Sequence, residues 1–435
     1  MKYTNIKSIY RLNLVMLMVF LVACDKEYIN PSSASSNQVL TDVNGLISVA
    51  NGLQYKYSVG QASPEYTVIS ASGLLAKELT VLNAGNLNEL LLQQGGASVI
   101  GNNGIVTNMW NQSNLIKSNA KLILDNLGLV SDQGTKGALQ AHAAIYKALA
   151  LGNLAMFWQQ APLSVEKNAT FSDRNTVLKE AISTLESAST ELAKAPVSSL
   201  FSSKIAPGID YANTINALIA RYALMSGDYD KALTAANAVN LAVSVKSVMN
   251  HDDASQNAMF FSSFGARNNT EPVDANFSLP VALQTLPADK RIAFFINPTV
   301  GKNKGNASFF VSNTTSVPIY RPGEVTLIKA EAYVRRSSPD LNAAVTELNK
   351  VITKAPSSDA LGIGAGLTAY AGAITAPAIL DEIYKQRCIE LYLSGLRLED
   401  SRRFARPSSE RGRDFLPYPF SERDNNPNTP TDPTN

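Results

Sequence analysis

Two long stretches of the chain repeat apolar residues at three- and four-residue intervals, which is the pattern of an amphipathic α-helix. They are residues 137–158 ("GALQAHAAIYKALALGNLAMFW") and 173–195 ("DRNTVLKEAISTLESASTELAKA"), with Pro162 in the loop between them. Asp173 or Asn175 can cap the second helix, because a short polar side chain accepts hydrogen bonds from the first free backbone N–H groups. The pattern predicts a pair of long helices over about residues 137–195.

Two further segments predict helix pairs, over about residues 211–243 and 322–355. The first contains "RYALMSGDYDKAL", which matches the turn of a tetratricopeptide repeat, with Gly227 at the turn and Ala232 at the close contact between the helices. Helical periodicity returns over residues 378–405. Because irregular stretches separate the pairs, we predict a mainly α-helical protein with an interrupted array of tetratricopeptide-like pairs, unlike a plain solenoid.

Two segments lack periodicity and are rich in Asn, Gly, Ser and Phe, at about residues 83–108 and 254–318. Irregular segments longer than ~15 residues are usually functional or disordered. The two segments are therefore candidates for a functional role.

The N-terminus has a basic segment followed by an apolar run from Leu12 to Val22. This run is shorter than the ~20 apolar residues that span a bilayer, and its flanks are typical of a secretory signal. The sequence "LVAC" that ends at Cys24 resembles the lipobox of bacterial lipoproteins. We predict a lipoprotein signal peptide over residues 1–23, lipidation of Cys24, a Ser-rich tether over residues 24–37 and a single folded domain over residues 38–435.

Charge is scarce, at 17% of the residues, compared with roughly 25% in ordinary soluble proteins. The formal net charge is +2, and loss of Lys2, Lys7 and Arg11 with the signal peptide leaves −1. A nearly neutral chain has no global electrostatic attraction to nucleic acid, so we expect no nucleic-acid partner.

The chain lacks the usual motifs of catalysis and cofactor binding. It has two His residues, no Cys/His spacing for zinc, no Walker loop, no dinucleotide fingerprint and no nucleophile elbow. Trp110, Trp158 and His142 fall on helical patterns and are interpreted as core residues. We expect no cofactor, no metal and no enzymatic activity, although scattered carboxylates leave a glycosidase as an alternative.

The stretch "QRCIELYLSGLRLEDSRRF" carries a family resemblance. It resembles the C-terminal hallmark of the SusD/RagB family of surface lipoproteins, with departures at Gln386, Ser394 and Ser401. The segment "YRPGEVTLIKAEAYV" resembles a second family helix, in which Pro322 and Gly323 are unusual. Acids accompany the arginines, so we interpret the hallmark as a buried, paired network that locks the C-terminal helices onto the repeats. Its hallmark residues are Arg387, Glu390, Gly395, Arg397, Asp400 and Arg403.

The resemblance implies a fold and a function. It implies a SusD-like α-α superhelix whose repeat face meets a SusC-like TonB-dependent transporter, while the irregular side binds ligand. It further implies a lipid-anchored protein on the outer face of the outer membrane. The implied ligand is an oligosaccharide, or a peptide as in RagB-like members.

Glycan sites need flat aromatic rings to stack on sugars and amides to hydrogen-bond hydroxyls. Each such residue has an alternative, purely structural role: an Asn can stabilise a turn, and an aromatic ring can pack in a local core. The absence of a loop Trp keeps a peptide ligand open, and a tetratricopeptide-type scaffold without ligand is a further alternative. The candidate ligand-binding residues are Tyr55, Tyr57, Tyr66, Asn83, Asn86, Asn88, Phe260, Phe261 and Phe264.

Overall fold

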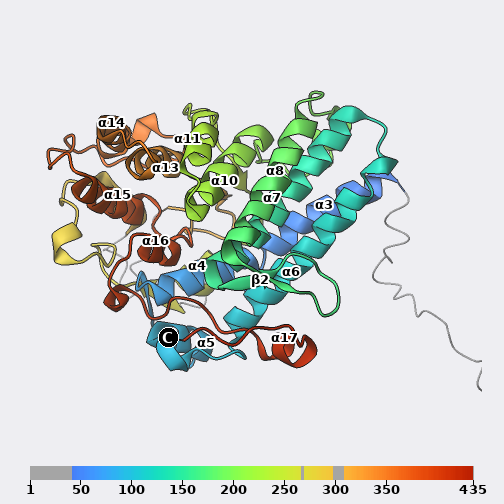
Figure 1. Ribbon diagram of the computed structural model, residues 1–435, viewed down its shortest axis with the longest axis horizontal. Helices are drawn as coiled ribbons and strands as arrows, with labels where there is room; N and C mark the ends of the chain where they lie inside the picture. The colour runs from blue at the N-terminus through green and yellow to red at the C-terminus, as the bar shows by residue number, and fades with distance from the viewer. Residues whose placement is uncertain (1–41, 266–268, 297–307, 435) are drawn as a thin grey trace, which may run out of the picture. The chain divides into compact units, whose positions relative to one another are not determined.

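Helices make up most of the described part of the protein, which comprises residues 42–265, 269–296 and 308–434 of a computed structural model (Figure 1). The predicted signal peptide, Cys24 and the tether lie outside the described residues. Among the residues that the structure describes, no helix is long and apolar enough to cross a membrane.

Four long helices lie side by side at one end of the unit formed by residues 42–435 (Figure 1). Each helix is preceded by a polar residue whose side chain accepts a hydrogen bond from a backbone N–H of the first turn. As predicted, Asp173 caps the helix that begins at Arg174, through the Thr176 N–H. The side chain of Asp132 caps the helix that begins at Gln133 in the same way. The four helices are α3 (Val43–Ser58), α6 (Gly104–Asp125), α7 (Gln133–Phe157) and α8 (Arg174–Leu192).

The helix pairs stack one after another, because α8 contacts α10 and α11 contacts α13. Gly227 ends α10 with a φ of 83°, a left-handed conformation that glycine adopts without steric cost. Ala232 is fully buried against the paired helix. The mainly α, tetratricopeptide-like fold class is therefore confirmed. The stacked helices are α10 (Tyr211–Ser226), α11 (Tyr229–Asn237), α13 (Pro322–Arg335), α14 (Leu341–Ile352) and α15 (Ala376–Glu390).

Shorter elements fill the remaining described part of the chain. Among them α4 is buried along its whole length, so it forms a central core helix. The short α-helices are α4 (Pro64–Leu75), α5 (Leu87–Gln94), α9 (Ser199–Ser202), α12 (Lys290–Phe295), α16 (Arg397–Arg403) and α17 (Phe420–Asn425). A π-helix spans Phe260–Phe264, and 3₁₀ turns span Gly96–Ser98, Leu127–Leu129, Val281–Leu283, Pro356–Ser358 and Ser408–Glu410.

Three antiparallel strand pairs join segments of the described chain. Strand β1 (Leu79–Val81) pairs with β5 (Thr270–Pro272), with Thr80 opposite Glu271. Strand β2 (Gln160–Pro162) pairs with β3 (Phe171–Asp173), and β4 (Val248–Met249) pairs with β6 (Val317–Pro318). The first and third pairs bring segments that are distant in sequence into contact.

The C-terminal segment returns to the long helices and closes their aromatic core. Trp110 and Trp158 are buried with their ring centroids 5.0 Å apart in an edge-on arrangement, which confirms their interpretation as core residues. The indole of Trp158 donates to the Pro417 carbonyl at 3.0 Å, and the indole of Trp110 donates to Glu422 at 3.1 Å. Pro417 and Glu422 thus complete the hydrogen bonding of the aromatic core of the long helices.

Candidate functional site

The early tyrosines do not share one surface. In α3, Tyr55 is 56% exposed, whereas Tyr57 is buried with its ring edge-on to Tyr146 at 5.7 Å. Burial raises the pKa of Tyr57 to about 12, although a hydrogen bond from Asn153 opposes the shift. Tyr66 is buried in α4 and donates to Glu89 at 2.9 Å.

The three candidate asparagines lie around the start of α5, and local contacts use two of their side-chain amides. The Asn83 amide oxygen accepts from the Gly85 N–H at 2.8 Å, and the Asn86 N–H donates to the Asn83 carbonyl at 2.9 Å. The amide oxygen of Asn88 accepts from the Gly104 N–H at 2.8 Å and so ties α5 to the start of α6. Their role in ligand binding stays a prediction.

The candidate phenylalanines form the π-helix. Phe264 is buried and stacks on Phe310 with ring centroids 5.9 Å apart, while Phe260 and Phe261 are half-buried. The pairing of β1 with β5 places this segment beside the asparagine loop, where the Leu82 N–H donates to the Asn269 carbonyl at 3.0 Å. The structure therefore brings the Asn and Phe segments together, whereas Tyr55 lies at a cleft that none of these candidate Asn and Phe side chains lines.

Tyr55 lies at an open cleft with a volume of ≈ 640 Å³. The walls of the cleft are the second half of α3, residues 206–207 and residues 250–255. This volume falls within the ~300–1,000 Å³ that is usual for small-molecule sites. Sequence reasoning found Tyr55 but missed Gln54 and the other two walls, because the helical periodicity of α3 was not recognised and the cleft exists only in the folded chain.

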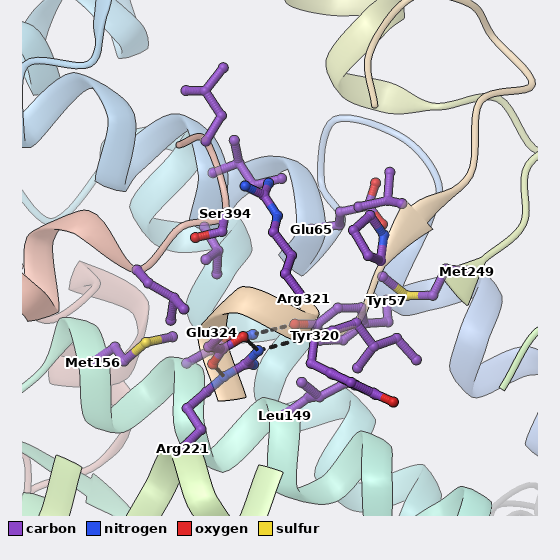
Figure 2. A pocket seen from close by; sticks show the side chains of 18 of the residues that line it. Tyr57, Glu65, Leu149, Met156, Arg221, Met249, Tyr320, Arg321, Glu324 and Ser394 are labelled. Atoms are coloured by element: carbon purple, nitrogen blue, oxygen red, sulfur yellow. Dashed lines mark hydrogen bonds and ion pairs between the residues drawn. The ribbon is translucent and has the colours of Figure 1, made fainter. Parts of the chain in front are cut away.

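A smaller cavity of ≈ 70 Å³ lies deeper in the protein (Figure 2). The Arg221 guanidinium binds the Glu324 carboxylate through two hydrogen bonds, from Nε at 2.5 Å and from Nη2 at 2.7 Å. Dashed lines in Figure 2 mark this ion pair, and Met156 and Met249 lie at opposite sides of the cavity. A cavity of this size holds a few water molecules, which need ≳ 10–15 Å³ each, and excludes an oligosaccharide.

The cavity is lined by buried polar atoms without a hydrogen-bond partner among the described residues. They are both carboxylate oxygens of Glu65, the hydroxyl of Tyr320 and the hydroxyl of Ser394. Buried polar atoms of this kind are usually satisfied by ordered water. The site is therefore a polar interior that suits water.

An acid–imidazole pair separates the cavity from the cleft. Glu65 lines the cavity, His251 lines the cleft, and the Glu65 Oε1 and His251 Nε2 atoms are 3.5 Å apart. Burial raises the pKa of Glu65. Burial acts to lower the pKa of His251, but the neighbouring Glu65 carboxylate outweighs it, so the pKa is raised. Both groups of the pair therefore hold their protons more tightly than they would in water.

The hallmark residues form the expected buried network, with partners that the sequence did not specify. Arg387 binds Asp400 through two hydrogen bonds at 2.9 and 3.0 Å, and Arg403 also binds Asp400, at 2.6 Å. Glu390 accepts from Arg291 at 3.1 Å and from Lys354 at 2.7 Å. These charged side chains are buried or partly buried and paired with one another, so they are unavailable to a ligand.

Two hallmark residues, Gly395 and Arg397, have roles other than forming ion pairs. Gly395 has a φ of 84°, and a Cβ there would collide with the Val68 side chain, so only glycine fits between α15 and α16. Arg397 is buried with its guanidinium 5.4 Å from the centre of the Tyr384 ring, a cation–π geometry that differs from the expected charge pairing.

The described residues contain no group of three or more His, Cys, Asp or Glu side chains placed to hold a metal ion. His142 is fully buried in α7, where its ring nitrogens contact the Ala50 carbonyl at 2.9 Å and the Tyr211 hydroxyl at 3.1 Å. Burial lowers the pKa of His142 to about 4. His142 is thus a packed core residue, as the sequence indicated.

Comparison with known proteins agrees with this architecture. Residues 294–432 match the model of the SusD family. A SusD superfamily protein from Bacteroides vulgatus aligns with 18% identity and a TM-score of 0.69, covering 90% of this chain and 99% of its own. A SusD superfamily protein from Bacteroides fragilis aligns with 16% identity, a TM-score of 0.68 and the same coverage. No curated protein matches the chain.

A third neighbour is described as a laminarin-binding SusD-like protein, with 14% identity, a TM-score of 0.66, and coverage of 90% of this chain and 98% of its own. The matched C-terminal segment contains the hallmark network, and the structural likeness extends over most of the chain. The protein is therefore SusD/RagB-like.

Proposed function

We propose that this protein is a cell-surface lipoprotein that captures an oligosaccharide and delivers it to a SusC-like TonB-dependent transporter. The observation that carries the proposal is a ligand-sized cleft with an exposed tyrosine in a SusD-like fold. The laminarin-binding description of one structural neighbour supports the choice of a carbohydrate. The transporter, the lipid at Cys24 and the outer-membrane location rest on the family resemblance and the lipobox.

A binding role without catalysis is the second part of the proposal. Glycoside hydrolysis normally needs two carboxyl groups facing each other across the scissile bond. In the cleft, Asp252 is the carboxylate among the lining residues, and its side chain accepts hydrogen bonds from its own loop. We therefore expect the protein to hold glycans without cleaving them.

The test is binding of the purified full-length protein to arrays of glycans and peptides. We expect selective binding to oligosaccharides and no accumulation of reducing sugar on long incubation. Binding to peptides alone would favour a RagB-like peptide carrier, and sustained sugar release would show a glycosidase.

Delivery to a transporter needs a separate experiment. We expect chemical crosslinking in native outer membranes to join the protein to a large β-barrel transporter. A protein that is never crosslinked to such a transporter, but still binds glycan, would retain the binding role and lose the delivery role. A protein that binds neither glycan nor peptide would fit a scaffold.

A further inference from the structure

We infer that the open cleft on α3 is the binding subsite for a neutral oligosaccharide, with the Tyr55 ring as its stacking platform and the Gln54 carboxamide as its hydrogen-bonding anchor. This inference rests on the proposed carbohydrate-binding function and names the surface, the residues and the chemical class of ligand. The candidate residues of the Asn- and Phe-rich loops are not part of it.

Tyr55 stands out among the aromatic residues of the described chain. The exposed aromatic side chains there are Tyr55, at 56%, and Phe420, at 46%. The Tyr55 side chain makes no hydrogen bond or ring contact with another described residue, whereas the side chains of Tyr57, Tyr66 and Phe264 are all used in internal contacts. An exposed ring on the wall of a cleft offers the flat apolar face on which a sugar ring stacks.

Gln54 supplies a second and independent observation. It is only 5% exposed, it lines the cleft, and its amide oxygen has no hydrogen-bond partner among the described residues. A buried acceptor without a hydrogen-bond partner destabilises the protein, because it has lost its bonds to water. A ligand that carries hydroxyl donors removes that destabilisation, so the carboxamide favours a sugar over an apolar molecule.

Hydrogen bonds hold in place the wall of the cleft that residues 206–207 form. The Asn51 side chain in α3 donates to the Lys204 carbonyl at 2.8 Å and accepts from the Ala206 N–H at 2.8 Å. The Asn250 side chain donates to the Pro207 carbonyl at 2.8 Å. The Asn51 amide thus ties residues 204–206 to α3, and the Asn250 amide ties residue 207 to the wall formed by residues 250–255.

Hydrogen bonds also hold the wall formed by residues 250–255. The carboxylate of Asp252 accepts from the N–H groups of Ala254 at 2.9 Å and Ser255 at 2.7 Å, and the His251 imidazole contacts the Ser255 carbonyl at 3.0 Å. On its other side, the His251 Nε2 atom lies 3.5 Å from the Glu65 Oε1 atom. A preformed cleft loses little ordering entropy on binding, which favours affinity from few contacts.

The charges of the cleft indicate a neutral ligand. Lys56 and Asp252 are exposed and carry opposite charges, and the His251 imidazole faces Glu65 on the cavity side of the wall. No uncompensated charge is left to select a phosphate, a uronate or an amine. The volume of ≈ 640 Å³ suits a short oligosaccharide or one end of a longer glycan.

The decisive experiment measures binding of short neutral gluco-, manno-, galacto- and xylo-oligosaccharides to the full-length protein by titration calorimetry. We expect Tyr55→Ala to weaken the best of these ligands by about tenfold or more, and Tyr55→Phe to stay within about threefold of the original, because the ring face makes the contact. We expect Gln54→Leu to weaken binding by about five- to tenfold. Phe420→Ala, which removes the other exposed aromatic ring, is the matched control and should bind unchanged.

The outcomes separate the two levels of proposal. If the unaltered protein binds none of these sugars, the carbohydrate function fails, and the subsite fails with it. If it binds a sugar but Tyr55→Ala and Gln54→Leu leave the affinity unchanged, the function stands and the subsite is overturned. If the same two variants weaken a peptide instead of a sugar, the cleft is a peptide site and the inference is overturned.

Discussion

Tyr55 and Tyr57 show how much a two-residue step means on a helix. An α-helix turns by about 100° per residue, so side chains two positions apart point to nearly opposite sides. In α3 this places Tyr55 in solvent and Tyr57 against Tyr146. Recognising Asp42 as a helix cap would have separated the two residues on sequence alone. Tyr66 could not have been assigned in this way, because α4 is buried on all sides.

His142 is the residue with the clearest acid sensitivity. Its pKa is lowered from 6.5 to about 4, because burial disfavours the charged imidazole. The unfolded state therefore takes up this proton first, so the stabilisation is complete above pH ~6.5 and is lost as the pH falls towards ~4. We expect this residue alone to remove up to about 3 kcal/mol from the free energy of unfolding over that window.

The measurement is urea unfolding across this pH window for the unaltered protein and for His142→Gln, which keeps a polar side chain and does not titrate. Carboxylates contribute equally to both proteins, so the difference between the two pH profiles isolates the imidazole. Parallel profiles would show that His142 does not resist protonation.

At the scale of elements, periodic segments were predictable and distant pairings were not. The three helix pairs have apolar positions at regular helical steps, and local sequence marks their caps and turns, as Gly227 does between α10 and α11. The pairing of β1 with β5 joins three-residue strands that are far apart in the chain. Strands this short leave no periodic pattern, and their partners are chosen by the packing of the surrounding helices.

Gly323 is an unusual residue for the family-like helix that becomes α13, and packing between elements explains it. A Cβ at this position would overlap the Glu390 carboxylate of α15. That carboxylate is buried and accepts from Arg291 and Lys354. The missing side chain therefore leaves room for the ion pairs that join α15 to the rest of the fold.

We expect Gly323→Ala to lower the free energy of unfolding by about 2–4 kcal/mol, because the new methyl group displaces a paired, buried carboxylate. Gly128→Ala is the control, since its Cβ would meet nothing within 4 Å, and it should change stability by no more than about 0.5 kcal/mol. Chemical denaturation of both variants provides the comparison. Equal stability of the two would rule out the packing explanation.

At the scale of the whole molecule, the sequence predicted the class of protein better than it predicted the cleft on α3. The hallmark residues are close in sequence, so their spacing survives as a readable pattern around Arg387 and Asp400. The cleft is assembled from α3, residues 206–207 and residues 250–255, and no local pattern connects these segments. Only the folded chain shows that Tyr55 on α3 lies beside residues 206–207 and 250–255.

Anchoring is a property of the whole molecule that one substitution tests. We expect Cys24→Ala to leave the melting temperature of the folded domain unchanged and to release the protein from membranes. Each acyl methylene buried in a bilayer contributes ~0.8 kcal/mol, and the variant would lose all of them. Fractionation after a high-salt wash is the measurement, and a variant that stays with the outer membrane would show that lipid is not the main anchor.

The C-terminal segment sets the order in which this core can be completed. Pro417 and Glu422 provide the acceptors for the indoles of Trp158 and Trp110. These two acceptors lie 259 and 312 residues further along the chain than the tryptophans that they pair with, so they are synthesised later. The aromatic core of the long helices is therefore completed only after the segment that carries Pro417 and Glu422 has been synthesised.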